Sequence, residues 1–171
     1  AVVVGGVMIV SALLGIFLFN PLEVGGCRFF MENSEYQPTV GRLGFAFQKG
    51  MYGKTVLTLF LRKLFIGLWS LLLIVPGIVK AYEYRMVPYL LADDPNMTRQ
   101  DAFRLSKELM YGQKWNTFVL DLSFIPWNIL STITFGLVGL FYVSPYQDAT
   151  YAELYDALAA GMPGNNGQRV Y

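Results

Sequence analysis

Charged side chains interrupt two otherwise apolar stretches of this sequence, and their chemistry makes them the first candidates for function. A lone charge at the centre of a bilayer costs at least about 2.5–3.5 kcal/mol, so such a residue is either paired or functional. Carboxylate, guanidinium and phenol groups together can relay a proton or an ion, or hold a polar headgroup. The candidate ligand-binding or intramembrane polar cluster consists of Glu83, Arg85, Asp121 and Asp148, with the tyrosines Tyr82, Tyr89 and Tyr146 beside them.

Each of these groups also has a purely structural interpretation. Asp121 either relays a proton or contacts a substrate, or it forms a buried ion pair or hydrogen bond that fixes helix register. Glu83 and Arg85 either line a cavity that opens outward, or they snorkel toward water while the tyrosines form an interface belt. Asp148 and Tyr146 are typical of a solvated or headgroup-level helix face, where Asp148, Tyr151 and Tyr155 share one side by spacing.

Pairing among these charges follows from their spacing and sign. We expect Lys80 to pair with Glu83 or Tyr84 on one helix face. The remaining cations of the apolar stretches need acids as partners. The predicted pairs join Arg85, Arg62 or Lys63 to Asp121, Asp148 or Glu23.

The sequence lacks the residues of common catalytic sites. It contains no histidine, which excludes Ser-His-Asp and Cys-His catalysis and the commonest zinc ligand sets. Its single cysteine, Cys27, rules out an internal disulfide and fits a small apolar residue beside Gly25 and Gly26. No phosphate-binding, nucleophile-elbow or dinucleotide motif is present. We therefore expect no enzyme activity, no catalytic residue, no metal and no cofactor.

Composition points to lipid as the main solvent of the chain. Of its 171 residues, 54% are hydrophobic and 15% are charged, whereas ordinary soluble domains carry about 25% charged residues. The formal net charge of +1 gives no field that would attract nucleic acid. The prediction is an all-α, polytopic transmembrane bundle built of helical hairpins, with one interfacial amphipathic helix.

The central hairpin is predicted within residues 53–93. Pro76 and Gly77 divide this stretch, because proline ends a helix and glycine accepts unusual dihedrals. The predicted legs are residues 55–75 and 78–92.

A single domain, residues 1–160, is expected to hold the other elements. The first span covers residues 1–19 and continues to 32 with a kink at Asn20-Pro21; an alternative places a tight turn near residues 11–15. A loop covers residues 33–51. Residues 98–111 form the interfacial helix, or alternatively a helix packed on the protein's own loops. A second hairpin has legs 115–135 and 137–159 and turns at Gly136, and residues 161–171 form a flexible tail.

A short repeat supports hairpins as the building unit. Gly15 precedes Pro21 by six residues, and Gly139 precedes Pro145 by the same spacing. Pro88 occupies a similar place in a third apolar leg. The match is short and apolar, so chance competes with duplication as its origin.

Positive charge predicts the orientation. The basic loops around Arg42 and Lys49 and around Arg104 and Lys107 both favour the cytoplasmic side. They lie on the same side only if residues 53–93 cross the membrane twice. The prediction is a multi-pass protein of the bacterial plasma membrane with five spans and a cytoplasmic C-terminus.

A family resemblance accompanies these patterns. The stretches NPLEVGGCRFF, LIVPGIVKAYEYRMVPYLLAD, RLSKELMYGQKW, FVLDLSFI and SPYQDATYAELY resemble the bacterial integral membrane family catalogued as domain of unknown function 975. The chain is also distantly similar to the membrane domain attached to some glycerophosphodiester phosphodiesterases. The resemblance implies a multi-helix plasma-membrane protein and supplies no activity. Because family members carry a further N-terminal helix and this chain begins without methionine, we expect it to lack its native start.

Two functional hypotheses follow. In the first, the hairpin bundle binds or passes an amphipathic or polar ligand or lipid through its charged legs. In the second, the protein is a non-catalytic accessory or scaffold subunit of a larger membrane complex. The expected partners are membrane lipids, with other membrane subunits or self-association as further candidates and no nucleic acid. Placing Glu83, Arg85 and Asp121 around a cavity would favour the first hypothesis, and pairing all three in dry helix contacts would favour the second.

Overall fold

The computed structural model describes residues 2–33, 39–48, 50–134 and 136–161, with side chains described from residue 6 onward. These residues form helices and turns and contain no β-strand, which confirms the all-α prediction. The predicted flexible tail, residues 161–171, lies outside the described residues except for Gly161.

The N-terminal segment is one long helical run. It consists of α1 (Val2–Leu14), a π-helical turn η1 (Gly15–Phe19) and α2 (Asn20–Asn33). The alternative turn near residues 11–15 is therefore wrong, and the irregularity lies just before the expected kink at Asn20-Pro21. Pro21 has no N–H to give to the carbonyl of Phe17, and the hydroxyl of Tyr52 donates to that oxygen instead at 2.8 Å.

The segment expected to be a loop carries a 3₁₀ helix, η2 (Val40–Phe47), packed on α2. The contact is close because Gly25 has no side chain: a Cβ there would lie 2.7 Å from the carbonyl carbon of Leu43. The guanidinium of Arg28 lies 5.0 Å from the centre of the Phe45 ring. Phe45 therefore packs on the protein's own α2.

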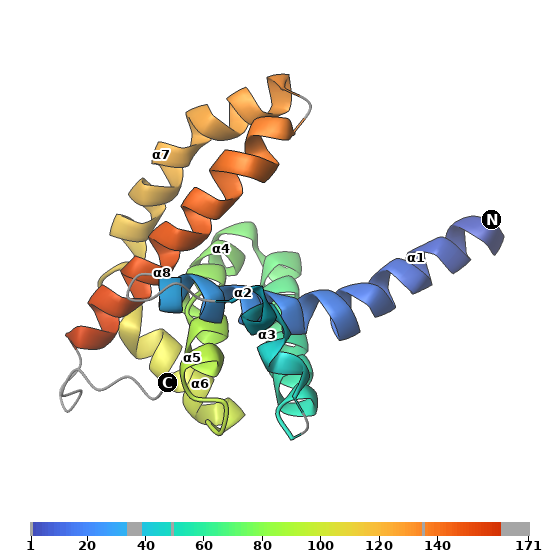
Figure 1. The fold of residues 1–171 in the computed structure, drawn as a ribbon, viewed down its shortest axis with the longest axis horizontal. Helices are drawn as coiled ribbons and strands as arrows, with labels where there is room; N and C mark the ends of the chain where they lie inside the picture. The colour runs from blue at the N-terminus through green and yellow to red at the C-terminus, as the bar shows by residue number, and fades with distance from the viewer. Residues whose placement is uncertain (1, 34–38, 49, 135, 162–171) are drawn as a thin grey trace.

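The chain turns back once within residues 53–93, at Leu73. Helix α3 (Tyr52–Leu72) ends there, and α4 (Ile74–Glu83) packs alongside it in the reverse direction (Figure 1). Leu73 is extended, with φ −156° and ψ 134°. The predicted turn at Pro76-Gly77 is thus wrong by a few residues. Pro76 lies in the first turn of α4, where a missing N–H leaves no intrahelical bond unmade.

The return leg is broken, whereas the prediction for residues 78–92 was a single helix. Helix α4 ends at Glu83, and after a turn over residues 84–86 a second helix, α5 (Val87–Asp93), continues. Pro88 lies at the start of α5, where it is well tolerated. Because of this break, Arg85 lies in a turn and not within a helix.

A capped helix, α6 (Arg99–Leu109), follows a tight loop. Thr98 is its N-cap, and its hydroxyl oxygen accepts from the backbone N–H of Asp101 at 3.2 Å. The same hydroxyl donates to the Asp101 carboxylate at 2.5 Å. This hydrogen bond, with Arg104 nearby, holds the pKa of the Asp101 carboxyl below its usual value. Ala102, Ser106 and Leu109 are buried, while Arg104 and Lys107 are exposed.

The second hairpin consists of α7 (Lys114–Ile133) and a return leg formed by a π turn η3 (Gly139–Val143) and α8 (Ser144–Ala160). Gly136 has φ +82°, which favours glycine and fits the predicted turn. Helix α7 continues through Pro126. Each π turn precedes a proline, so η1 before Pro21 and η3 before Pro145 give the Gly-to-Pro repeat a shared local geometry.

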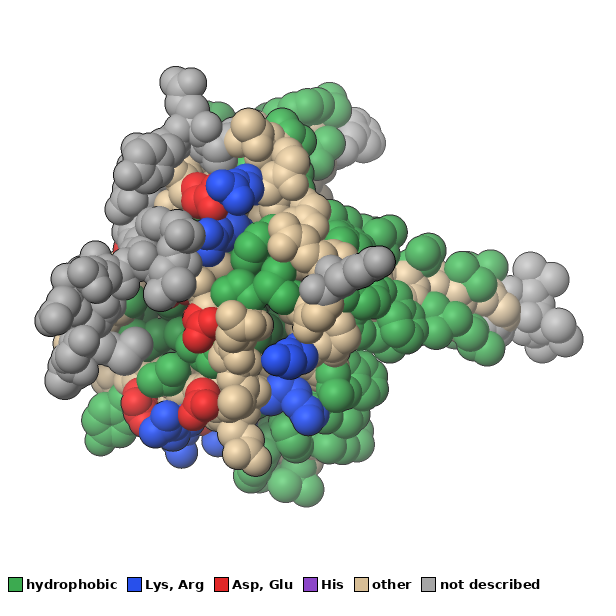
Figure 2. Space-filling view, turned by 60° about the horizontal axis from the view of Figure 1, so that its bottom comes forward, with side chains coloured by type: hydrophobic (Ala, Val, Ile, Leu, Met, Phe, Trp, Pro, Cys, Tyr) green, Lys and Arg blue, Asp and Glu red, His purple; other side chains and the backbone are tan. Residues whose placement is uncertain are grey.

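The core lies where α2, α5, α6 and α8 meet, with Met31, Met86 and Met110 fully covered. Both hairpin turns point toward one end of the molecule, and the α5–α6 loop lies at the other (Figure 1). Figure 2, turned toward this second end, shows basic and acidic side chains interspersed over it. Helix α1 projects away from the body of the molecule (Figure 1).

Two helical stretches of the described chain are long and apolar enough to cross a membrane. They are residues 6–33, with 28 residues, and Tyr52–Leu72, with 21. Of the five predicted spans, two therefore contain a described helix that meets this length and composition.

Candidate functional site

A cavity of about 510 Å³ opens where α2, α3, α4, α5 and α8 converge. Its walls are both apolar and charged. Leu22, Phe30 and Ile66 contribute hydrocarbon. The charged groups come from four places in the fold: Glu23 on α2, Arg62 on α3, Arg85 in the turn before α5, and Asp148 on α8. This mixture of surfaces suits an amphipathic molecule.

One charged wall is an ion-pair group around Glu23. Its carboxylate accepts from Arg62 at 2.7 Å and pairs with Lys63 at 3.3 Å. Lys63 also donates to the buried amide oxygen of Asn20 at 2.5 Å. The Nε–H of Arg62 is buried and has no hydrogen-bond partner. The pairing of Arg62 and Lys63 with Glu23 agrees with the predicted set, and it leaves one donor of Arg62 unused.

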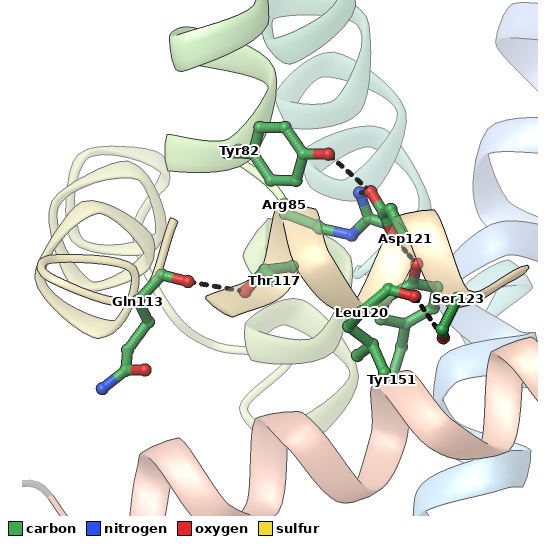
Figure 3. Close-up of polar contacts among 8 residues, drawn as sticks. All are labelled: Tyr82, Arg85, Gln113, Thr117, Leu120, Asp121, Ser123 and Tyr151. Carbon is green, nitrogen blue, oxygen red and sulfur yellow. Dashed lines mark hydrogen bonds and ion pairs between the residues drawn. The ribbon is translucent and has the colours of Figure 1, made fainter. Parts of the chain in front are cut away.

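A second charged group joins three helices through Asp121. Arg85 donates to both of its carboxylate oxygens, at 3.0 and 3.2 Å. The hydroxyls of Tyr82, at 2.7 Å, and of Tyr151 donate to the same carboxylate, as Figure 3 shows. The Arg85 guanidinium also lies over the Tyr151 ring, 4.1 Å from its centre. Asp121 therefore fixes α4, the Arg85 turn and α8 against α7.

Asp148 differs from these groups because it lacks a counter-ion. It is exposed, lines the cavity, and makes no hydrogen bond or ion pair with any described residue. Tyr89, on the same cavity, is buried and stacks on Tyr155 with ring centres 5.8 Å apart. Asp148 is thus a carboxylate that faces open space.

Glu83 lies outside the cavity in a bridge of its own. Lys80 donates to it at 2.5 Å and Lys114 at 2.6 Å, so α4 is tied to the start of α7. Its backbone carbonyl accepts from Ser106 of α6 at 2.7 Å. The pair between Lys80 and Glu83 is the one predicted from their spacing.

The seven residues proposed from sequence separate into three groups in the structure. Arg85, Tyr89 and Asp148 line the cavity. Tyr82 and Asp121 adjoin it through Arg85. Glu83 and Tyr146 lie outside it. The exposed ring of Tyr146 stacks on Tyr142, with ring centres 6.3 Å apart.

Sequence reasoning missed a buried ionic group on α2. Arg28 donates to Glu32 at 2.6 Å and to the carbonyl of Ala92, the penultimate residue of α5, at 2.8 Å. Arg42 of η2 pairs with Glu32 at 2.9 Å. The four-residue spacing of Arg28 and Glu32 was a signal for this pair. Among the described residues, no group of three or more His, Cys, Asp or Glu is placed to hold a metal ion.

Comparison with known proteins defines the family. The model of the family described as Protein of unknown function (DUF975) matches residues 71–161, which is more than half of the chain. The chain belongs to this family. No curated protein and no solved structure matches it.

The part of the chain that matches DUF975 contributes only one side of the cavity. Arg85, Tyr89, Asp121 and Asp148 fall within the matched residues, whereas Glu23 and Arg62 precede them. The DUF975 region thus supplies the unpaired carboxylate and the Asp121 junction. The segments before it close the cavity from the other side.

Proposed function

We propose that this DUF975 protein is an integral, multi-pass protein of the bacterial plasma membrane that binds, or passes, an amphipathic ligand through its cavity. The observation that carries the proposal is the cavity itself, which combines ionised groups with hydrocarbon walls. A water-soluble metabolite has no need of Leu22, Phe30 and Ile66, and a pure hydrocarbon has no need of four charges. An amphiphile uses both surfaces.

Exposure of apolar side chains supports the membrane part of the proposal. Leu71, Ile74 and Val75 at the first hairpin turn are between 71% and 86% exposed. At the second turn, Leu140 and Phe141 are 68% and 76% exposed. Soluble monomers rarely expose continuous apolar surface of this kind. Lipid would cover these turns, and α3, about 30 Å long, matches the thickness of a bilayer core.

The pairing of charges between helices also fits a membrane setting. Arg62, Lys63 and Arg85 each find a carboxylate on another helix. In lipid, where no water is present to solvate a charge, such pairs are the usual way to hold ionised groups. The cavity then places the unpaired Asp148 where a ligand can reach it.

Filling the cavity tests the ligand-binding proposal. Gly26 lines the cavity, and a Cβ built on it meets no atom within 4 Å, so Gly26→Leu adds bulk without a clash at Cβ. The protein, purified in mild detergent and mixed with vesicles of phosphatidylethanolamine and phosphatidylglycerol, is examined by native mass spectrometry. Wild-type protein retains lipid, and Gly26→Leu loses most of it at an unchanged melting temperature.

The neighbouring glycine provides the matched control. Gly25→Ala forces a methyl group onto the Leu43 carbonyl, so it lowers stability by about 1–3 kcal/mol and loosens η2. A loss of lipid that follows stability in both variants, or lipid retention unaffected by Gly26→Leu, would contradict a binding site in the cavity.

A second candidate, a non-catalytic accessory or scaffold subunit, is favoured by other contacts. Glu83 and Asp121 are both tied into interhelical bridges and neither lines the cavity, which is the pattern expected of structural charges. Helix α1 also presents exposed Met8 and Ile9 away from the body. Under this hypothesis, Gly26→Leu leaves cellular function intact, whereas Ile9→Lys on α1 abolishes it.

A further inference from the structure

The charges of the cavity are matched except at two points. Glu23 is satisfied by Arg62 and Lys63, and Arg85 is satisfied by Asp121. The carboxylate of Asp148 and the Nε–H of Arg62 remain without partners. One is an acceptor that carries a negative charge, and the other is a donor on a positively charged group. The two residues that carry them, Asp148 and Arg62, line the same cavity.

Unmatched groups of opposite sign indicate what a ligand must carry. A buried donor without a partner costs about 1–3 kcal/mol, and an unpaired carboxylate gains most from a charge-assisted bond. A simple anion would satisfy Arg62 and be repelled by Asp148. A simple cation would do the reverse. A ligand with both signs on one short headgroup satisfies each of them.

Resting on the proposed function, we infer that the ligand is a zwitterionic lipid whose headgroup carries a phosphodiester and a primary ammonium. The ammonium bonds to Asp148 on α8, and the phosphodiester bonds to Arg62 on α3. The acyl chains follow the hydrocarbon of Leu22 and Ile66 out of the cavity.

The aromatic rings of the cavity favour a primary ammonium over a trimethylammonium. Recognition of trimethylammonium uses free aromatic faces. Here one face of Tyr151 is covered by the Arg85 guanidinium, and one face of Tyr89 by the ring of Tyr155. A primary ammonium instead donates hydrogen bonds, which the bare carboxylate of Asp148 accepts. Ethanolamine headgroups are thus preferred to choline headgroups.

Lipid selectivity tests this inference. The full chain in mild detergent is mixed with equal amounts of phosphatidylethanolamine, phosphatidylglycerol and phosphatidylcholine, and retained lipid is measured by native mass spectrometry. We expect phosphatidylethanolamine to be retained about tenfold over either competitor, the ratio that one charge-assisted hydrogen bond provides. A separate arm adds soluble glycerophosphoethanolamine as a competitor. Weak displacement by it assigns the site to the lipid, and displacement at equal concentration assigns it to the free headgroup and overturns the lipid.

Substitutions on α8 locate the selectivity. Asp148→Asn abolishes the preference for ethanolamine while phosphatidylglycerol is still retained, and Asp148→Glu keeps the preference because it keeps the carboxylate. Glu153→Gln removes an exposed carboxylate of the same helix outside the cavity and leaves selectivity unchanged. Arg62→Lys, which keeps the charge and removes Nε, weakens retention of all three phospholipids.

The outcomes separate this inference from the proposed function. Equal retention of the three lipids by wild-type protein, or an undiminished preference in Asp148→Asn, overturns the zwitterion assignment. Loss of all lipid in Gly26→Leu would still uphold the cavity as a binding site. If Gly26→Leu has no effect on retention, the proposed function fails along with the inference.

Discussion

At the scale of residues, Asp121 is the most densely bonded acid of the described chain. It accepts from Tyr82 of α4, from Arg85 in the turn between α4 and α5, and from Tyr151 of α8. Removing it would leave the donors of these three side chains without their acceptor in a partly buried place. A donor left unsatisfied costs more than the net value of the bond it made.

Asp121→Ala is therefore expected to destabilise the protein by about 1–3 kcal/mol. Thermal unfolding in detergent, followed by circular dichroism, measures the effect. Ser123→Ala is the control, because that exposed hydroxyl bonds only to the Leu120 carbonyl of its own helix (Figure 3). Equal melting temperatures for the two variants would show that the Asp121 junction contributes nothing to stability.

The sequence predicted well which charged residues need a partner. It predicted less well which partner each of them takes. Lys80 and Glu83 were paired by spacing on one helix, and Arg85 was assigned a small set of acids that included Asp121. Asp148 belonged to that set and turned out to lack a partner. Its isolation depends on how α8 packs against α2, and the order of residues carries little information about such packing.

At the scale of elements, the two hairpins share a close contact between their legs near the turn. In each, a glycine of the return leg meets a serine of the outgoing leg. A Cβ at Gly77 would lie 2.6 Å from Cα of Ser70, and one at Gly139 would lie 3.2 Å from Cβ of Ser131. Small residues at such crossings let helices approach closely. The contact is with backbone in the first hairpin and with side chain in the second.

This difference predicts different responses to added methyl groups. Gly77→Ala pushes two backbones apart and costs about 1–3 kcal/mol, and Ser70→Ala in the same chain does not restore the loss. Gly139→Ala meets only the Ser131 side chain, so adding Ser131→Ala recovers most of its cost. Melting temperatures of the four variants measure both effects. Rescue of Gly77→Ala by Ser70→Ala would contradict a backbone contact there.

Turn positions were the least predictable part of the elements. Proline both ends helices and begins them, so Pro76-Gly77 was assigned to the turn although it opens α4. The chain bends at Leu73, a residue whose type gives no warning. Gly136 was predicted correctly because a turn with positive φ selects glycine.

At the scale of the whole molecule, both hairpin turns point toward one end and the charged α5–α6 loop lies at the other. The composition and the two predicted hairpins led to this arrangement of the ends. They did not predict that the return leg would be broken or that α1 would project away from the body. Those features depend on long-range packing. The proposed topology places the turns outside the cell and the charged end in the cytoplasm.

Single-cysteine labelling tests this topology. In a Cys27→Ala background, the only native cysteine is removed, and cysteines are introduced one at a time at Leu73, Leu137 and Asn96. In intact cells, a membrane-impermeant maleimide is expected to label positions 73 and 137 and to reach position 96 only after lysis. Labelling of Asn96→Cys together with Leu73→Cys in intact cells would show that the first hairpin does not cross.

The two π turns have a consequence for how the chain can vary in length. A π turn contains one residue more than an α turn, so everything after Phe19 and after Val143 is rotated by about 100° relative to an unbroken α-helix. That rotation aims Glu23 and Asp148 at the same space. Deleting a single residue from η1 would turn Glu23 to a different side of its helix, and a deletion in η3 would do the same to Asp148. Neither deletion would change a residue that lines the cavity. These ten positions therefore act as spacers whose number matters more than their identity.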